Sequence, residues 1–129
     1  MSPWDGLNRR KFPRVNYPCL VIVSQEQDKQ SVILTHTENV GVGGVCVILK
    51  KNLKLFSPTE IELDLLDMGD HIKCAGKVVW SVRRKSGEKK KPLFYDIGIE
   101  FVDIPEADLK RVTNVVEKLV KQGKEIPYT

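Results

Sequence analysis

The sequence has no long apolar run. A membrane-spanning helix needs roughly 18 or more consecutive apolar residues, and no segment of the 129-residue chain approaches that length. Residues 1–8 also lack the basic and then apolar layout of a secretory signal peptide. From these two absences we expect no membrane partner, no export and a cytoplasmic location.

Cysteine is scarce, with only Cys19, Cys46 and Cys74 in the chain. Their odd number and wide spacing leave no C-x-x-C pair, which is the usual sign of a zinc site or a redox dithiol. Each lies in an apolar stretch, where a free cysteine packs like a small hydrophobic side chain. We therefore expect reduced cysteines that serve packing, as in cytosolic proteins.

Motifs that carry catalysis or bind metals are missing as well. His36 and His71 stand alone, without the H-x-x-x-H or carboxylate spacing of a metal site. There is no nucleophile elbow, no phosphate-binding loop and no local Cys/His arrangement. The sequence therefore predicts no metal, no cofactor, no catalytic residue and no enzymatic activity.

The composition fits one soluble domain. Hydrophobic residues make up 41% and charged residues 29% of the chain, as in ordinary globular proteins. We expect a flexible tail over residues 1–8, a domain over residues 9–122 and a C-terminal tail over residues 123–129. Residues 83–91 hold six basic residues and one acid. A solvated loop is the main interpretation of this run, and a surface that steers an anionic partner is the alternative.

The apolar pattern predicts a mainly β protein. Six segments rich in apolar and β-branched residues are separated by polar, glycine or proline turns. Because a small open sheet would leave exposed edges, these strands should close into a six-stranded antiparallel barrel. The six segments are residues 17–24, 31–37, 45–49, 59–65, 71–82 and 93–102.

The fifth strand and a C-terminal helix have clear periodicities. One parity of the fifth strand holds Ile72, Cys74, Gly76, Val78, Trp80 and Val82, with polar residues mostly on the other. A helix should begin at Pro105, with acidic residues in its first turn, and end near Gly123. Its apolar residues follow helical spacing, so we expect it to lie against the barrel.

Two clusters are suited to ligand recognition. Residues 9–14 (RRKFPR) form a basic stretch in which proline disfavours helix, so we expect a flexible cationic arm. Arginine binds phosphate and guanine through bidentate hydrogen bonds and stacks on bases. Residues 39–44 (NVGVGG) predict a glycine-rich turn, where Asn39 offers an amide to a base edge. Taken singly, each cluster also fits a plain solvated segment or an ordinary turn.

Together the two clusters resemble the PilZ domain family, whose motifs are R-x-x-x-R and, after two strands, D/N-x-S-x-x-G. The first motif appears as residues 10–14 (RKFPR) and the second as residues 39–44. Residues 77–80 (KVVW) and 95–101 (YDIGIEF) are similar to the later strands of the family. The resemblance covers about residues 9–120, which is nearly the whole chain.

The resemblance implies a PilZ-type six-stranded barrel with a C-terminal helix that binds the bacterial second messenger cyclic di-GMP. Arg10 and Arg14 would grip phosphates and stack on guanine. Asn39 would hydrogen-bond a guanine edge, and Gly44 would keep the turn open for the nucleotide. A basic residue at Arg9 resembles family members that take up a stacked ligand dimer.

Gly41 departs from the family pattern, because it stands where the family usually has serine. Losing one neutral hydrogen bond costs about 1 kcal/mol, so binding should be weakened several-fold but not abolished. Trp80 is expected mainly to pack in the core or at the barrel rim, and is a secondary candidate for stacking on the ligand.

The main hypothesis is therefore a receptor in which ligand orders the arginine arm and changes the affinity for an unidentified protein effector. One alternative is a PilZ-like adaptor that has lost ligand binding, which the change at Gly41 favours. Another is nucleic-acid binding through residues 83–91, although no aromatic residue interleaves with these basic residues.

Overall fold

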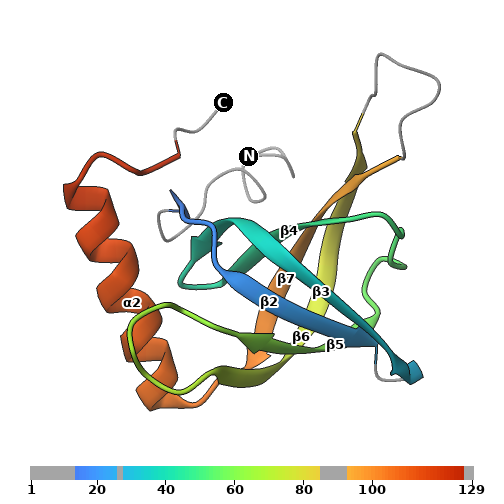
Figure 1. Cartoon of the computed structure of the whole chain (residues 1–129), viewed down its shortest axis with the longest axis horizontal. Helices are drawn as coiled ribbons and strands as arrows, with labels where there is room; N and C mark the ends of the chain where they lie inside the picture. Colours follow the sequence, from blue (N-terminus) through green and yellow to red (C-terminus); the bar gives the residue numbers. More distant parts are fainter. Residues whose placement is uncertain (1–13, 26–27, 85–92, 127–129) are drawn as a thin grey trace, which may run out of the picture.

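A computed structural model describes residues 14–25, 28–84 and 93–126 and has a mainly β architecture with one C-terminal helix (Figure 1). The predicted fold class is confirmed. The elements are β1 (Arg14–Asn16), β2 (Leu20–Gln25), β3 (Asp28–Gly41), β4 (Gly44–Leu49), β5 (Pro58–Leu63), β6 (Ile72–Arg83), β7 (Tyr95–Asp103) and α2 (Glu106–Lys121).

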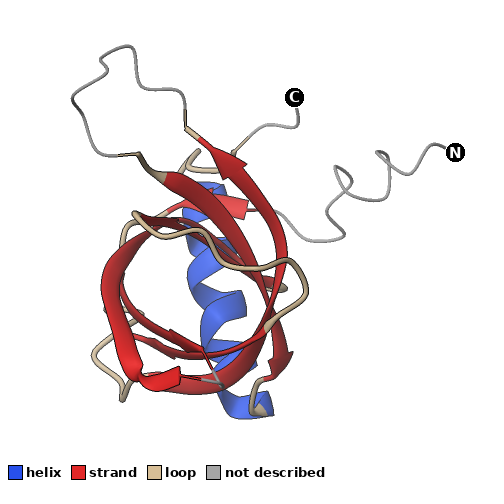
Figure 2. Cartoon of the chain, turned by 90° about the vertical axis from the view of Figure 1, so that its right-hand side faces the viewer, coloured by secondary structure: helices blue, strands red, loops and turns tan. Residues whose placement is uncertain are grey.

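Six of the strands close into a barrel. They are hydrogen-bonded in the order β3-β2-β5-β6-β7-β4, and β4 pairs back with β3, so the ring is complete. Every pairing is antiparallel. Figure 2 looks into this ring. The short strand β1 was not predicted. Among the strands of the described residues it pairs with β3, and it adds a seventh strand to the sheet.

Alternation along the strands fills the barrel. In β4 the side chains of Val45, Val47 and Leu49 are buried in one core cluster, and in β7 those of Ile97 and Ile99 join them. The residues between them face outward, because side chains alternate across a strand. The three cysteines are free. Cys19 and Cys46 are buried, and Cys74 is partly buried.

Strand β6 departs from the predicted parity. Its register with β7 shifts between Ala75 and Gly76 and again between Val78 and Trp80. A β-bulge adds one residue to a strand and so reverses the side-chain alternation beyond it. Val78 is buried, whereas Val82 is 56% exposed. The prediction that one parity would continue through the whole strand is therefore wrong beyond Val78.

Helix α2 covers one end of the barrel and lies behind the ring in Figure 2. Val112 and Val116 are its buried residues and belong to the core cluster. The helix ends as predicted near Gly123, which has a left-handed φ of 79° and donates from N to Val120 O at 3.0 Å. Within the described ranges, no helix is long and apolar enough to cross a membrane.

The segment after α2 returns to β1. Asn16 N donates to Lys124 O at 3.0 Å, and Ile126 N donates to Arg14 O at 2.8 Å. Val15 and Glu125 form an isolated antiparallel bridge between these two hydrogen bonds. Strand β1 therefore lies between β3 on one side and the C-terminal segment on the other.

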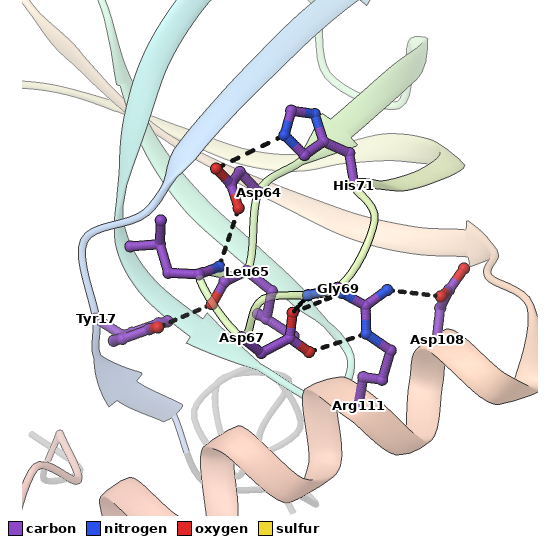
Figure 3. Close-up of polar contacts among 9 residues, drawn as sticks. Tyr17, Asp64, Leu65, Asp67, Gly69, His71, Asp108 and Arg111 are labelled. Carbon is purple, nitrogen blue, oxygen red and sulfur yellow. Dashed lines mark hydrogen bonds and ion pairs between the residues drawn. The ribbon is translucent and has the colours of Figure 1, made fainter.

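The loop between β5 and β6 fastens α2 to the barrel (Figure 3). Arg111 of α2 donates from Nε to Asp67 Oδ2 at 2.9 Å and from Nη2 to Asp67 Oδ1 at 2.6 Å. Its Nη1 donates to Asp108 Oδ1 at 3.1 Å. On the same loop, Leu65 O accepts a hydrogen bond from Tyr17 Oη at 2.8 Å. The bidentate pair thus joins the helix to the loop.

Removing the Asp67 carboxylate should lower the free energy of unfolding by about 1 kcal/mol at neutral pH. The pKa of Asp67 lies below its usual value because Arg111 hydrogen-bonds the carboxylate. Its stabilisation is therefore present above the unfolded pKa of about 4 and is lost as the pH falls through the folded pKa. Urea unfolding should show a gap between wild type and Asp67→Ala at about pH 7 that narrows at about pH 3.

The matched control is Asp70→Ala, because Asp70 lies in the same loop, is exposed and makes no ion pair within the described ranges. This variant should unfold like the wild type at both pH values. A gap for Asp67→Ala that stays the same at both pH values would contradict an origin in the ion pair.

Candidate functional site

The basic segment that precedes the barrel ends in strand β1. Val15 is buried, so its neighbours Arg14 and Asn16 lie on the outer side of the sheet. Arg14 pairs in register with Gly41, and Asn16 pairs with Asn39. The prediction of a flexible arm is therefore wrong for Arg14, whose backbone is paired on both sides.

Asn39 meets Arg14 on this outer face. Arg14 Nη1 donates to Asn39 Oδ1 at 3.0 Å in a partly buried contact that joins positions 25 apart. The register of β3 with β4 shifts between Thr37 and Asn39, which makes Glu38 a bulge residue. Thr37 is buried, so without the bulge Asn39 would also face the core. The bulge therefore brings the two motifs together.

The predicted turn over residues 39–44 is much shorter in the structure. Only Val42 and Gly43 form the turn, while Asn39 and Gly41 belong to β3 and Gly44 begins β4. Gly41 and Gly44 face each other as the last pair of the β3–β4 ladder. The prediction of a glycine-rich turn over all of residues 39–44 is wrong in its bounds, because ladder pairing extends to both of these glycines.

Gly44 has a packing role of its own. It is buried, and a Cβ atom at this position would collide with the backbone carbonyl of Ile99 and approach Glu100 Cα at 3.0 Å. Only glycine allows β4 to approach β7 this closely. Its predicted role in admitting a nucleotide stays a prediction.

The outer row continues across the barrel to Trp80. Asn39 pairs with Cys46, Cys46 pairs with Gly98, and Gly98 pairs with Trp80. The chain neighbours of Gly98 are buried in the core, so Gly98 faces outward, and a Cβ there would collide with the Trp80 indole. The half-buried indole therefore lies over Gly98, on the same outer face as Asn39.

A charged cluster that the sequence did not predict borders this row. Arg84 donates from Nε to Asp96 Oδ1 at 2.8 Å and pairs through Nη2 with Glu38. Glu38 also accepts a hydrogen bond from the Cys46 thiol at 3.5 Å. Arg84 and Glu38 are 46 positions apart, and neither belongs to a motif. The sequence feature that could have drawn attention to this cluster is the position of Arg84 in the basic run at residues 83–91.

Burial shapes the acid–base properties of this face. It raises the pKa of Glu38, with Asp96 adding to the increase and Arg84 opposing it. Burial and then Glu38 raise the pKa of the Cys46 thiol to about 12. Cys46 therefore stays protonated at neutral pH and offers no thiolate nucleophile.

Two predicted site residues, Arg9 and Arg10, lie outside the described residues, as does most of the basic run at residues 83–91. The structure therefore brings together Arg14, Asn39, Gly41 and Gly44 on one face, with Trp80 at its far side. Within the part of the chain that is described, no group of three or more His, Cys, Asp or Glu side chains could hold a metal ion.

The PilZ domain family matches residues 8–118, a span that contains both motifs and every strand of the barrel. The chain therefore belongs to the PilZ domain family. No protein of curated function matches the chain in sequence.

Solved structures share the fold at low sequence identity. The PilZ domain of YcgR from Escherichia coli, with c-di-GMP, is 15% identical over 89% of this chain and 94% of its own, with a TM-score of 0.66. The K. pneumonia MrkH–c-di-GMP complex is 18% identical over 90% of this chain and 53% of its own, with a TM-score of 0.72. The Bacillus subtilis inhibitor of motility, MotI/DgrA, is 16% identical over 89% of this chain and 51% of its own, with a TM-score of 0.68. The chain spans about half the length of the last two proteins.

Replacing Gly44 with alanine should destabilise the barrel by about 1–3 kcal/mol, because the new Cβ would force β4 away from β7. Gly43→Ala is the matched control, since a Cβ there meets nothing within 4 Å and Gly43 has no positive φ. It should unfold within about 0.5 kcal/mol of the wild type. Urea denaturation measures both, and equal stabilities of the two variants would contradict the packing role of Gly44.

Proposed function

We propose that the protein is a cyclic di-GMP receptor that acts as a cytoplasmic adaptor and not as an enzyme. The observation that carries the proposal is the contact between Arg14 and Asn39. It joins the last residue of the arginine motif to the first residue of the second motif on one outer face. Membership in the PilZ domain family supports the proposal, as do similar structures of YcgR and MrkH that contain c-di-GMP.

Arg14 would contact a phosphate or stack on a guanine of the ligand. A guanidinium forms bidentate hydrogen bonds with phosphate and offers a flat face to a base. The hydrogen bond to Asn39 and the pairing of β1 already order Arg14, which reduces the entropy lost on binding. Arg10, the first arginine of the same motif, would supply the second guanidinium. Arg9 beside it would favour a stacked ligand dimer.

Asn39 and Trp80 would read and cover the base. The Asn39 amide can pair with a guanine edge, and the Trp80 indole offers a flat apolar surface across the row. Gly41 and Gly44 form the end of the hairpin beside Arg14, where Gly44 would let the nucleotide approach the backbone.

The acidic residues on this face form ion pairs with Arg84. Glu38 and Asp96 would repel phosphates, and the two ion pairs with Arg84 reduce that repulsion. The ion pairs therefore support the proposal that the face accepts a dinucleotide.

The proposed mechanism is a ligand-driven change of the surface that a partner protein contacts. Arg14 is already paired in β1, so ordering by the ligand would concern the residues before it, including Arg10. The partner is a protein effector that the sequence does not identify. An adaptor that binds no nucleotide is the alternative, and the absent hydroxyl at Gly41 favours it.

Isothermal titration with cyclic di-GMP should give saturable binding with a dissociation constant in the micromolar range or tighter. Arg10→Ala and Arg14→Ala should abolish the heat, and Asn39→Ala should weaken binding about tenfold. Two ligands bound per chain would support the role proposed for Arg9.

Arg83→Ala is the matched control, because Arg83 is exposed and makes no ion pair within the described ranges. This variant should bind like the wild type, and GTP should not compete. No heat from the wild-type protein at high ligand concentration would overturn the receptor proposal and leave the ligand-free adaptor. Binding of oligonucleotides with steep salt dependence, reduced by Arg83→Ala, would instead favour the nucleic-acid alternative.

Restoring the family serine should strengthen binding. Gly41→Ser adds one hydroxyl at the hairpin end, and one more neutral hydrogen bond is worth about 1 kcal/mol, or roughly a fivefold gain in affinity. The same titration measures it, with urea unfolding to check that the variant folds normally. An affinity that falls in a normally stable variant would contradict a ligand contact at this position.

A further inference from the structure

Another part of the barrel surface carries exposed apolar side chains. On β2 and β3, Leu20, Val32 and Leu34 are 53%, 55% and 67% exposed, and Ile22 is half-buried. Ile22 pairs directly with Leu34, and Val32 follows on the same outer side, so these four residues form one apolar strip. Single exposed apolar residues are ordinary, but a contiguous group marks an interaction surface.

Carboxylates run beside the apolar strip. On β5, Glu62 pairs in register with Ile22, and Glu60 pairs with Ser24. Asp64 N donates to Leu20 O at 2.9 Å, so a third acid stands at the end of the strip. These three residues form an acidic strip, and together the two strips are the apolar–acidic face.

The acidic strip is opposite in sign to the net charge of the protein. The chain carries a formal net charge of +4, whereas the acidic strip contributes three carboxylates. His71 Nδ1 lies 2.9 Å from Glu62 Oε2, and its Nε2 lies 3.6 Å from Asp64 Oδ2. Glu60 makes no ion pair among the described residues. A cationic group would therefore find an available carboxylate at Glu60.

A surface hollow of about 380 Å³ lies where the two strips meet. Its lining includes Ile22 from the apolar strip, Glu60 and Glu62 from the acidic strip, and Lys73 of β6. A side chain with an apolar stem and a charged end, such as lysine or arginine, has the shape and chemistry for such a place.

We propose that the apolar–acidic face docks a cationic amphipathic helix of a partner protein. The apolar side of the helix would pack on Leu20, Ile22 and Leu34, and its lysine or arginine side would lie along the carboxylates of β5. A helix is about 10 Å wide with its side chains, which is close to the width of two neighbouring strands.

Other occupants fit this face less well. Strands β2 and β5 are each paired on both sides, so the seam between the strips has no backbone groups left for an added peptide strand. An anionic membrane surface would be repelled by the carboxylates. A two-fold dimer through this face would bring the carboxylates of both copies together, while Lys73 of each copy already lies 3.8 Å from its own Glu62.

This inference deepens the proposed function by naming the kind of partner, and it rests on that function only for the idea that the receptor acts through a protein partner. The two surfaces share β3 but otherwise use different elements. The candidate nucleotide face uses β1, β3, β4, β7 and Trp80 of β6. The acidic strip lies on β5 and at Asp64 just after it, and half of the apolar strip lies on β2, which appears beside β5 in Figure 1.

The test uses the whole protein and a dye-labelled synthetic helix of about 18 residues, with leucine on one face and lysine on the other. Fluorescence anisotropy should show saturable binding that weakens as the salt concentration rises from about 0.05 M to 0.3 M. Leu34→Ser and Glu60→Lys should each weaken binding about tenfold. Both positions are exposed, so neither variant should disturb folding.

The matched controls are Leu55→Ser and Glu117→Lys, which make the same changes at exposed positions outside this face. They should bind the peptide like the wild type, and a peptide with glutamate in place of lysine should not bind. The proposal is overturned by an absence of saturable binding, by equal affinities of all four variants, or by equal binding of the acidic peptide. A concentration-dependent dimer that Leu34→Ser abolishes in sedimentation would also overturn it, in favour of self-association.

The two proposals can fail separately. Leu34→Ser and Glu60→Lys should keep the wild-type heat with cyclic di-GMP, and Arg14→Ala should keep wild-type affinity for the lysine peptide. Loss of nucleotide binding alone would leave the docking surface standing, and loss of peptide binding alone would leave the receptor standing.

Discussion

The pairing of β3 with β4 is the interaction on which the rest of this structure depends. It closes six strands into a ring and so removes the open edges that a small sheet would expose. The same hairpin carries Asn39, Gly41 and Gly44 on its outer side, and the far edge of β3 accepts β1 with Arg14. Closure of the barrel and assembly of the candidate nucleotide face are therefore one event.

The chain end reaches this face through the helix. Gly123 turns the chain after α2, and Lys124 and Ile126 then pair with β1 and fix the backbone of Arg14. At its other end α2 is held by the ion pair between Arg111 and Asp67. A change in how α2 sits on the barrel would thus reach Arg14 through a continuous set of hydrogen bonds, which gives the proposed adaptor a physical link between ligand and surface.

Both surfaces carry carboxylates, but the ion pairs of these carboxylates differ. Near the candidate nucleotide face, Arg84 offsets Glu38 and Asp96, so carboxylates there do not stand alone. Beside the apolar strip, Glu60 has no such partner in the described part of the chain. The two proposals therefore assign an anionic ligand to the face with Arg84 and a cationic partner to the face with Glu60.

The pattern of residues along the chain is enough to predict the six barrel strands, the C-terminal helix and its end at Gly123, because side-chain alternation and helical spacing are local properties. It also contains the two motifs that mark the family. Contacts in the folded chain, which the pattern does not predict, turn Asn39 and Trp80 outward, place Arg14 in a strand and bring Arg84 to Glu38. The physical reason is that β-bulges and cross-strand register depend on the neighbouring strand, so no spacing within one segment can reveal them.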